Sequence, residues 1–400
     1  MDDDTVGRAA AVERLRDLPR PDGPVERVSL ARAAGRVLAR PAEAPADVPA
    51  TDRATMDGYA FAAADGFPLS VVGEVYPEDD PPELGEGEAV AVATGAPLPA
   101  AADTVLMREE ATVTDGELSG PDRQPGTNVY PAGATAAAGE VLLAAGERVA
   151  PRHATLLRDA GVDEVTVRGR LDVGLVPTGT EIHEGRQPDR DSEMLANLLR
   201  AWGHCPTIDD ALPDDADAVR AGIEAGVERH DALVTTGGTS VGSADHVVSV
   251  LREHDVLFQG VALRPGRPVT VATVDGTPVF ALPGKPIAAH TAATLVARAF
   301  FAGTARLPTV PAAVAADLAV PDQGVEFAVP VTLEAGEPGQ EPRAIPLGHA
   351  ASSFALYGER FAPGRVASST RVSLADGVVL TREGLTAGEQ VAVVPYEAVE

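Results

Sequence analysis

The sequence predicts a multidomain α/β protein with a doubly wound parallel sheet at its centre. Residues 171–305 alternate short apolar runs with amphipathic segments, which is typical of parallel strands that alternate with helices. Residues 41–150 hold short apolar runs broken by Pro and Gly, as in irregular β-structure. Residues 311–400 return to short strands and turns, which fit a small β-barrel or a sandwich.

The elements of the central region follow in a regular order. Strands are expected in "LDVGLVPTG", "CPTIDDALPDD" and "DALVTTGG", and a hairpin is expected around Asp275-Gly276. Helices are expected in "DSEMLANLLRAWG", "DADAVRAGIEAGVERH", "SADHVVSVLREH" and "PIAAHTAATLVARAFF", the last with Pro286 in its first turn.

The N-terminal part predicts further helices and a turn. Residues 5–40 carry two Ala/Arg/Leu-rich segments with helical apolar spacing, and Ser29 is a plausible N-cap for the second. Residues 151–161 predict a short helix that ends at a glycine, and Asp115-Gly116 predicts a hairpin turn.

Composition limits the possible partners. The formal net charge is −28, and a hydrophobic content of 44% argues against a disordered acidic chain. No basic run is present, so a nucleic acid or an anionic membrane is an unfavourable partner. Cys205 is the only cysteine, which excludes an intrachain disulfide, and no 18-residue apolar run or secretory signal is found. A cytoplasmic protein is expected, and the acidic, lysine-poor composition suggests an organism adapted to high salt.

Three loops leave predicted strands at what should be one edge of the sheet. They are residues 177–182, 235–245 and 282–286, each rich in Gly, Thr, Ser or Pro. Ligands of open α/β sheets bind beyond the carboxyl ends of the strands. Gly237, Gly238 and Gly242 would let backbone N–H groups approach a phosphate, although a plain tight turn remains an alternative.

Positive charge gathers near the same edge. Lys285, in "LPGKP", is the only lysine of the chain, and Arg264 and Arg267 flank a Pro-Gly turn in "RPGRP". A guanidinium fork suits a tetrahedral oxyanion. Both arginines could equally be solvated residues of an ordinary loop.

Acidic residues occur in the same loops. Glu181, Asp191 and Asp245 could share a hard divalent cation with an anionic ligand. Asp191 could instead be only a helix N-cap, and the other two could be surface acids. His183 and Glu184 have no second spaced histidine, so a solvated loop is the simpler interpretation of that pair.

Seven segments occur in an order that resembles a known family. They are "DRATMDGYAF", "TGAPLPAAADTVLMRE", "NVYPAGATAAAGEVLLAAGERVAP", "LDVGLVPTGTEI", "TTGGTSVGSADHV", "RPGRP" and "FALPGKPIAA". Together they closely resemble the molybdopterin molybdenumtransferases, the MoeA and gephyrin E-domain family. The resemblance is strong over residues 5–305 and weak in the C-terminal region.

The resemblance implies a division of the chain. Residues 1–168 would form the helical and protruding β-rich N-terminal domains, with the β-rich part at about 45–145. Residues 169–305 would form the α/β molybdopterin-binding domain, and residues 306–400 a C-terminal β-barrel.

The resemblance also implies an enzyme. Members insert molybdate into adenylylated molybdopterin and release AMP with a divalent cation such as Mg²⁺, and molybdopterin adenylyltransferase is the implied pathway partner. The active cleft of the homodimer lies between the α/β domain of one subunit and the β-rich domain of the other. By motif position, Asp57 and Thr94 would be catalytic residues supplied across the dimer, and Glu181, Asp191 and Asp245 would be catalytic and engage the metal.

The implied substrate-binding residues lie in the three loops and in "RPGRP". They are Thr236, Gly237, Gly238, Ser240, Gly242, Arg264, Arg267, Pro283, Gly284, Lys285 and Pro286.

The chain departs from the family pattern at several of these positions. Arg264 and Arg267 stand where lysine is usual, and Thr180 stands where an acid is common. Glu193 and Lys285 both replace asparagine, so a non-catalytic or tungstate-selective pterin-binding paralogue stays open. An unrelated nucleotide-binding enzyme is disfavoured because no P-loop or GxGxxG follows a strand. Lys285 is predicted to contact an anion or to pair with a carboxylate such as that of Glu193.

Overall fold

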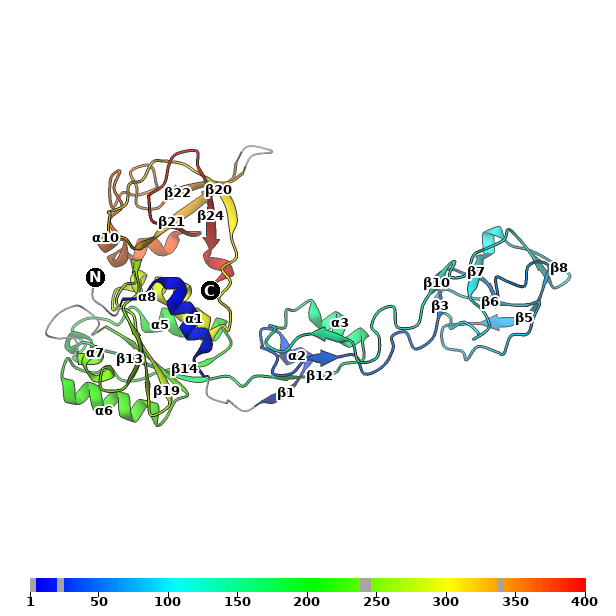
Figure 1. Ribbon diagram of the computed structural model, residues 1–400, viewed down its shortest axis with the longest axis horizontal. Helices are drawn as coiled ribbons and strands as arrows, with labels where there is room; N and C mark the ends of the chain where they lie inside the picture. The colour runs from blue at the N-terminus through cyan, green and yellow to red at the C-terminus, as the bar shows by residue number, and fades with distance from the viewer. Residues whose placement is uncertain (1–4, 20–24, 238–245, 337–340) are drawn as a thin grey trace. The chain divides into compact units, whose positions relative to one another are not determined.

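The computed structural model describes residues 5–19, 25–237, 246–336 and 341–400. Its contacts divide the chain into two compact units, one formed by Met1–Pro24 with Gly169–Glu400 and the other by Val25–Arg168. Figure 1 labels many of the helices and strands of both units. The expected division into residues 1–168, 169–305 and 306–400 stays a prediction. Among the described residues, no helix is long and apolar enough to cross a membrane.

One part of the Val25–Arg168 unit is built from short antiparallel pairs. Strand β1 pairs with β12 and β2 with β11, and the buried core between them includes Leu38, Leu157 and Val167. The elements are β1 (Glu26–Ser29), α2 (Leu30–Ala33), β2 (Ala42–Glu43), β11 (Val141–Leu143), α3 (His153–Asp159) and β12 (Glu164–Val167).

The prediction of a helix over residues 29–40 is wrong beyond the first turn. Helix α2 ends after Ala33, and the chain turns at Gly35, whose φ of 79° lies in the left-handed region that glycine favours. Val37 and Leu38 then form antiparallel bridges with Arg148 and Val167, so tertiary pairing overrides the helical spacing. Ser29 stands at the N-cap position, but its side chain makes no capping hydrogen bond.

The other part of this unit is a mixed six-stranded sheet with the order β7-β4-β6-β5-β9-β8. The predicted Asp115-Gly116 turn joins β8 to β9 with φ values of 51° and 84°, which confirms the hairpin. The strands are β4 (Gly58–Phe61), β5 (Leu69–Val75), β6 (Glu88–Val92), β7 (Thr104–Met107), β8 (Thr112–Thr114) and β9 (Glu117–Ser119), and β3 (Arg53–Ala54) pairs separately with β10 (Val129–Tyr130).

The central sheet of the other unit has the order β14-β13-β15-β19-β18-β16. Strands β14, β13, β15 and β19 run parallel as predicted, whereas β18 and β16 are antiparallel to their neighbours. The reversal of β18 follows from the predicted hairpin, since Asp275 and Gly276 adopt φ values of 49° and 84°. The strands are β13 (Asp172–Pro177), β14 (Cys205–Ile208), β15 (Ala232–Thr236), β16 (Asp255–Gln259), β18 (Thr270–Val274) and β19 (Thr277–Leu282).

Helices cover both faces of this sheet, as the doubly wound prediction requires (Figure 1). Helices α6 and α7 bury apolar side chains on one face, and α1, α5 and the α8–α9 segment pack on the other. The helices are α1 (Arg8–Asp17), α4 (Thr180–His183), α5 (Ser192–Ala201), α6 (Ala216–Val227), α7 (His246–Leu251), α8 (Pro286–Ala292), a π-helical turn at Ala293–Ala297 and α9 (Arg298–Phe301).

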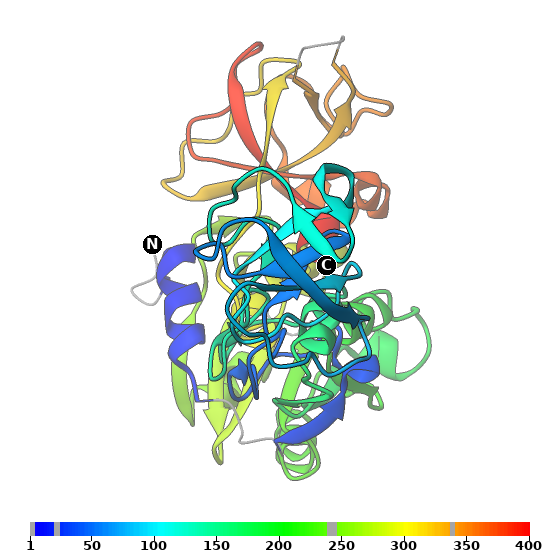
Figure 2. The ribbon, with the colours of Figure 1, turned by 90° about the vertical axis from the view of Figure 1, so that its right-hand side faces the viewer.

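The C-terminal region closes into a five-stranded β-barrel, drawn in yellow to red in Figure 1 and Figure 2. The pairing of β21 with β23 completes the closure, so the barrel prediction is confirmed and the sandwich alternative is wrong. The barrel strands are β20 (Val310–Val314), β21 (Glu326–Glu334), β22 (Arg343–Pro346), β23 (Gly377–Thr381) and β24 (Gln390–Pro395). The short strand β17 (Leu263–Arg264) pairs with β21, and α10 (Pro363–Ser368) packs against α8.

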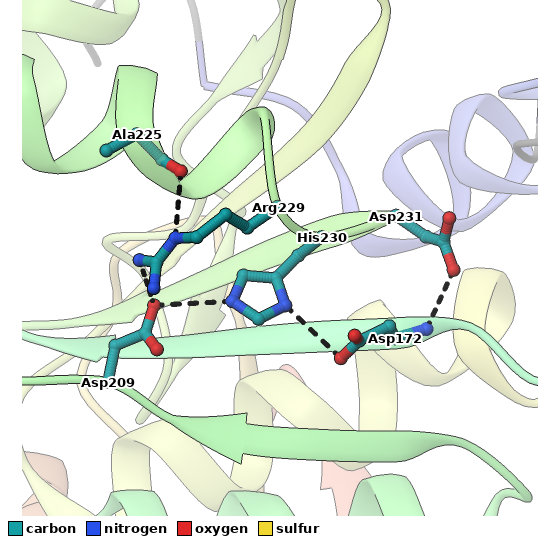
Figure 3. A network of polar contacts seen from close by, with 6 residues as sticks. All are labelled: Asp172, Asp209, Ala225, Arg229, His230 and Asp231. Atoms are coloured by element: carbon teal, nitrogen blue, oxygen red, sulfur yellow. Dashed lines mark hydrogen bonds and ion pairs between the residues drawn. The ribbon is translucent and has the colours of Figure 1, made fainter.

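A polar network holds the edge strand of the central sheet (Figure 3). The His230 ring, whose side chain is 6% exposed, lies between two carboxylates, with Nδ1 3.2 Å from Asp172 Oδ1 and Nε2 3.4 Å from Asp209 Oδ2. The Arg229 guanidinium also pairs with Asp209 Oδ2 at 2.9 Å. His230 covers Gly174, where an added Cβ would lie 2.5 Å from the ring. The network therefore ties the end of α6 to β13 and β14.

We expect His230→Gln to lower the free energy of unfolding by about 1–3 kcal/mol, because Asp172 Oδ1 loses its bond to His230 Nδ1 and the ring beside Asp209 is removed. Urea denaturation at pH 6 measures the loss. His254→Gln is the matched control, since that partly exposed histidine lies outside the network and should change stability by less than about 0.5 kcal/mol. Equal stability of the two variants would show that the carboxylates do not depend on His230.

Candidate active site at the carboxyl edge of the central sheet

The three predicted loops do begin at one edge of the sheet, the second of them being described as far as Gly237. Strand β13 pairs with β15, and β15 with β19, so their carboxyl ends lie side by side. The backbone N–H of Thr178 and its hydroxyl both donate to the carbonyl oxygen of Thr236, at 2.9 and 3.0 Å. The N–H of Gly237 donates to the carbonyl oxygen of Leu282 at 3.3 Å. These bonds confirm that the described beginnings of the three loops lie side by side.

Glycines let the loops approach one another more closely than side chains would allow. A Cβ added to Gly237, whose φ is 90°, would lie 2.7 Å from the carbonyl oxygen of Thr178. A Cβ added to Gly284 would lie 2.8 Å from the Cα of Gly237. Both glycines are thus required by backbone packing, and the "LPGKP" loop lies directly against the end of β15.

The first loop places Glu181 at the start of the short helix α4. Its half-buried carboxylate folds back over Gly179, with both oxygens 3.3 Å from the position that a Cβ would occupy there. Thr180, which stands where the family often has an acid, makes two reciprocal bonds with Asp214. Its N–H donates to Asp214 Oδ2 at 3.0 Å, and its hydroxyl accepts from the Asp214 N–H at 2.9 Å. Thr180 therefore fixes this loop rather than contributing charge.

Asp191 is buried at the start of α5 and does not cap the helix. Its side chain makes no capping bond; Asp189 Oδ1 accepts from the N–H groups of Asp191 and Ser192 instead, at 2.9 and 3.2 Å. The N-cap interpretation of Asp191 is therefore wrong. Burial and, to a smaller extent, the charge of Asp189 raise the pKa of Asp191, and the charge of Arg190 lowers it. The resulting pKa is about 6. A raised pKa of a buried carboxyl group is often found in functional sites.

Three buried oxygens near this edge were not predicted by the sequence. Within the described residues, Asp191 Oδ1, Ser192 Oγ and Thr235 Oγ1 have no hydrogen-bond partner. Asp191 and Ser192 begin the helix that covers one face of the sheet, and Thr235 follows Val234 and Leu233 along β15. Buried polar atoms without partners are costly, so they mark places where a bound ligand would be favourable.

The basic loop "RPGRP" packs against the helix that follows "LPGKP". A Cβ added to Gly266 would lie 3.6 Å from the carbonyl oxygen of Ala288 in α8. Arg264 and Arg267 are half-buried, and Arg264 Nε is a buried donor without a hydrogen-bond partner in the described part of the chain. Both arginines thus stand in a packed loop beside the site, which does not fit freely solvated side chains.

Lys285 occupies the N-cap position of α8 and is exposed. Its carbonyl oxygen accepts from the N–H of Ala289 at 2.9 Å, and its side chain makes no capping bond. Within residues 5–19, 25–237, 246–336 and 341–400, its ammonium group has no ion-pair partner, so the expected alternative of a pair with Glu193 is wrong. Contact with an anion stays a prediction.

Asp57 and Thr94 form a second polar site in the Val25–Arg168 unit. The N–H and hydroxyl of Thr94 both donate to Asp57 Oδ1, at 2.7 and 2.8 Å, and these bonds lower the pKa of Asp57. Gly58 locks the register of β4 against β7, because a Cβ there would lie 2.0 Å from the carbonyl oxygen of Leu106. Thr94 therefore holds the exposed carboxylate of Asp57 in place through Oδ1, and it makes no bond to Oδ2.

Four predicted site residues lie outside the described residues: Gly238, Ser240, Gly242 and Asp245. Their roles stay predictions. Across the described ranges, no three His, Cys, Asp or Glu side chains are grouped so that they could hold a metal ion. A metal site of Glu181, Asp191 and Asp245 is not tested by this finding, because Asp245 is not among those residues.

Comparison with known proteins agrees with the fold and the site. Two family models match the chain, the MoeA N-terminal region (domain I and II) over residues 7–161 and the probable molybdopterin binding domain over residues 174–302. The crystal structure of a molybdopterin biosynthesis MoeA protein from Pyrococcus horikoshii is 28% identical, with a TM-score of 0.77 and coverage of 98% of this chain and 99% of that one. The fold and its central edge therefore define a protein of the MoeA class.

Sequence relatives make the assignment more specific. A putative molybdopterin biosynthesis protein of Methanocaldococcus jannaschii is 32% identical over 295 residues, which cover 69% of this chain and 74% of the relative. The molybdopterin molybdenumtransferase of Haemophilus influenzae is 31% identical over 294 residues, which cover 70% of this chain and 72% of the relative. The chain belongs to the molybdopterin molybdenumtransferase family, a family of enzymes of molybdenum cofactor biosynthesis.

Proposed function

We propose that this chain inserts molybdate into adenylylated molybdopterin and releases AMP. The observation that carries the proposal is the carboxyl edge of the central sheet, where three loops begin side by side near the buried Asp191, the half-buried Glu181 and a basic loop. In a chain of net charge −28, positive charge gathered at one strand edge favours an anionic ligand.

The basic residues fit the two anions of this reaction. Arg264 and Arg267 offer guanidinium forks to a molybdate oxyanion, and they keep the charge of the lysines usual in the family. Lys285 offers an exposed ammonium group to the phosphate or the oxyanion. The 238–242 segment, which follows Thr236 and Gly237, would present backbone N–H groups to the pterin phosphate, and Pro283, Gly284 and Pro286 shape the adjoining loop.

The acidic residues fit a hard divalent cation. Glu181 and Asp191 present carboxylate oxygens, the ligands that Mg²⁺ prefers, and Asp191 Oδ1 has no protein donor among the described residues. With Asp245 they would hold the ion, which when bound neutralises the charge that develops on the phosphoanhydride. The pKa of Asp191 is raised to about 6 in the fold alone, and a bound cation would favour the ionised form that coordinates it.

We further propose that the active enzyme is a homodimer in which Asp57 and Thr94 act across the interface. The preformed hydrogen bonds of Thr94 keep Asp57 ionised and leave one of its oxygens for substrate. Coupling to a molybdopterin adenylyltransferase, a cytoplasmic location and adaptation to high salt are part of the same proposal. The net charge of −28 supports the last point, because salt screens the repulsion within such a chain.

The deciding experiment incubates the purified protein with adenylylated molybdopterin, Mg²⁺ and molybdate, at low salt and in molar KCl, and measures AMP release. AMP release that requires molybdate is the expected result, with more activity at high salt. Absence of release in folded protein at both salt concentrations would contradict the proposal.

Glu193 and Lys285 stand where the family usually has asparagine, and this favours a second candidate function. Both side chains are exposed at the starts of helices that border the site. A non-catalytic or tungstate-selective paralogue would bind the pterin without cleaving the adenylate, or would prefer tungstate. Replacing molybdate by tungstate in the same assay, and binding measured without turnover, separate these outcomes.

A further inference from the structure

The turn formed by residues 396–400 holds α8 at its middle. The Nε2 atom of His290 donates to Glu400 Oε1 at 2.7 Å, and the His290 ring packs edge-on against Tyr396, with ring centroids 4.8 Å apart at 89°. The hydrogen bond lowers the pKa of Glu400, so the carboxylate is stabilised in its ionised form. The turn itself is closed by N–H groups of Val399 and Glu400, which both donate to the carbonyl oxygen of Tyr396 at 2.9 Å.

The same turn also holds the end of α5. The indole Nε1 of Trp202, the residue that ends α5, donates to the carbonyl oxygen of Val399 at 3.0 Å. Trp202 is buried in the core that α5 shares with α8. One turn therefore contacts both helices whose first residues border the site, since α5 begins after Asp191 and α8 begins after Lys285.

Displacement of α8 would reach the site directly. His290 follows Lys285 by five residues, which is roughly 7.5 Å along a helix at 1.5 Å per residue. Gly284 has no spare room against Gly237. A π-helical turn begins right after α8, so this helix is not held from its far end by an unbroken α-helical ladder. The contacts of His290 are thus well placed to set where the "LPGKP" loop lies.

We propose that His290 and Glu400 are positioning residues that set the Lys285 loop relative to Asp191. The expected effect on molybdate binding rests on the proposed function. The expected effect on the position of the Lys285 loop rests on the geometry alone. The two residues do not touch the reacting atoms; they fix the helix that carries the binding loop.

The single lysine gives a direct readout of this loop. Reductive methylation with ¹³C-formaldehyde labels Lys285 and the α-amino group, which are distinguished by their resonance positions. Glu400→Gln keeps the shape of the side chain and removes the charge that His290 binds. Glu397→Gln changes an exposed carboxylate of the same turn and is the matched control. We expect the Lys285 methyl resonance to move in Glu400→Gln and to stay in place in Glu397→Gln.

Two further measurements complete the test. Amide exchange of residues 287–292 should quicken about tenfold in Glu400→Gln, as expected for a lost hydrogen bond to a charged group. In the AMP-release assay, the KM for molybdate should rise about fivefold or more while kcat falls less than about twofold, because binding geometry rather than a transition-state contact is lost. Glu400→Asp should recover part of the loss.

The outcomes separate this inference from the proposed function. An unmoved Lys285 resonance and unchanged exchange in Glu400→Gln would overturn the inference, whatever the activity. A moved resonance with unchanged KM in an active enzyme would also overturn it, since the residues would then be only structural. If the wild-type protein releases no AMP, the proposed function fails, while the resonance and exchange data still decide whether the turn sets the loop.

Discussion

Asp191→Asn should make the protein more stable at pH 8 by about 3 kcal/mol while it abolishes AMP release. Burial raises the pKa of Asp191 from 3.8 in the unfolded chain to about 6 in the fold. Because the folded-state pKa is the higher one, the fold favours the protonated acid. The stabilisation is complete below about pH 4, and it is lost as the pH rises from 4 to 6. An asparagine stays neutral throughout and removes the penalty above pH 6.

The measurement is the free energy of unfolding at pH 4 and at pH 8, in the presence of EDTA so that no bound cation contributes. Wild type and Asp191→Asn should coincide at pH 4 and separate at pH 8. Asp210→Asn is the control, because this exposed carboxylate of the same unit should change stability by less than about 0.5 kcal/mol. An Asp191→Asn variant that is no more stable at pH 8 would show that the buried carboxylate is compensated in the fold.

A stabilising variant that loses activity is the expected signature of a group kept for function. The helix start does not need the Asp191 carboxylate, because Asp189 already accepts from the first N–H groups of α5. The fold therefore retains a buried acid that costs stability at neutral pH, and its Oδ1 has no hydrogen-bond partner in the described part of the chain. Functional sites commonly carry such costs.

The site could be predicted mainly from the alternation of strands and helices along the sequence. Loops after β13, β15 and β19 could be placed at one edge because parallel strands point their carboxyl ends the same way. The hairpin at Asp275-Gly276 followed from turn chemistry, which requires positive φ at both positions. These features depend on local sequence alone, which explains why they were predictable.

Other features depend on contacts between distant residues and could not be predicted. The segment at 29–40 has helical spacing, but Val37 and Leu38 form bridges with Arg148 and Val167, more than a hundred residues away. Asp191 has the sequence position of an N-cap, and only the loop geometry reveals that Asp189 takes that role. The contact of His290 with Glu400 joins residues 110 positions apart and leaves no local signal.

Gly237→Ala should lower the free energy of unfolding by about 2–5 kcal/mol and weaken substrate binding. The first cause is the backbone, because a φ of 90° is unfavourable by roughly 1–2 kcal/mol for a residue with a Cβ. The second cause is space, since the Cβ would lie 2.7 Å from the carbonyl oxygen of Thr178, and forced overpacking costs about 1–3 kcal/mol. The loop must then move away from Thr178 and Gly284, which separates the three strand ends.

The difference between Gly237→Ala and the control variant Gly185→Ala isolates the cost of the close contact with Thr178. Gly185 has a φ of 69° and no atom within 4 Å of the added Cβ, so it carries the backbone penalty alone. Urea denaturation of both variants gives the difference, and the KM for adenylylated molybdopterin reports on the loop. If Gly237→Ala costs no more than Gly185→Ala and leaves KM unchanged, the three loops are not packed as one surface. A larger loss confined to Gly237→Ala, with a raised KM, would tie the packing of the strand ends directly to substrate binding.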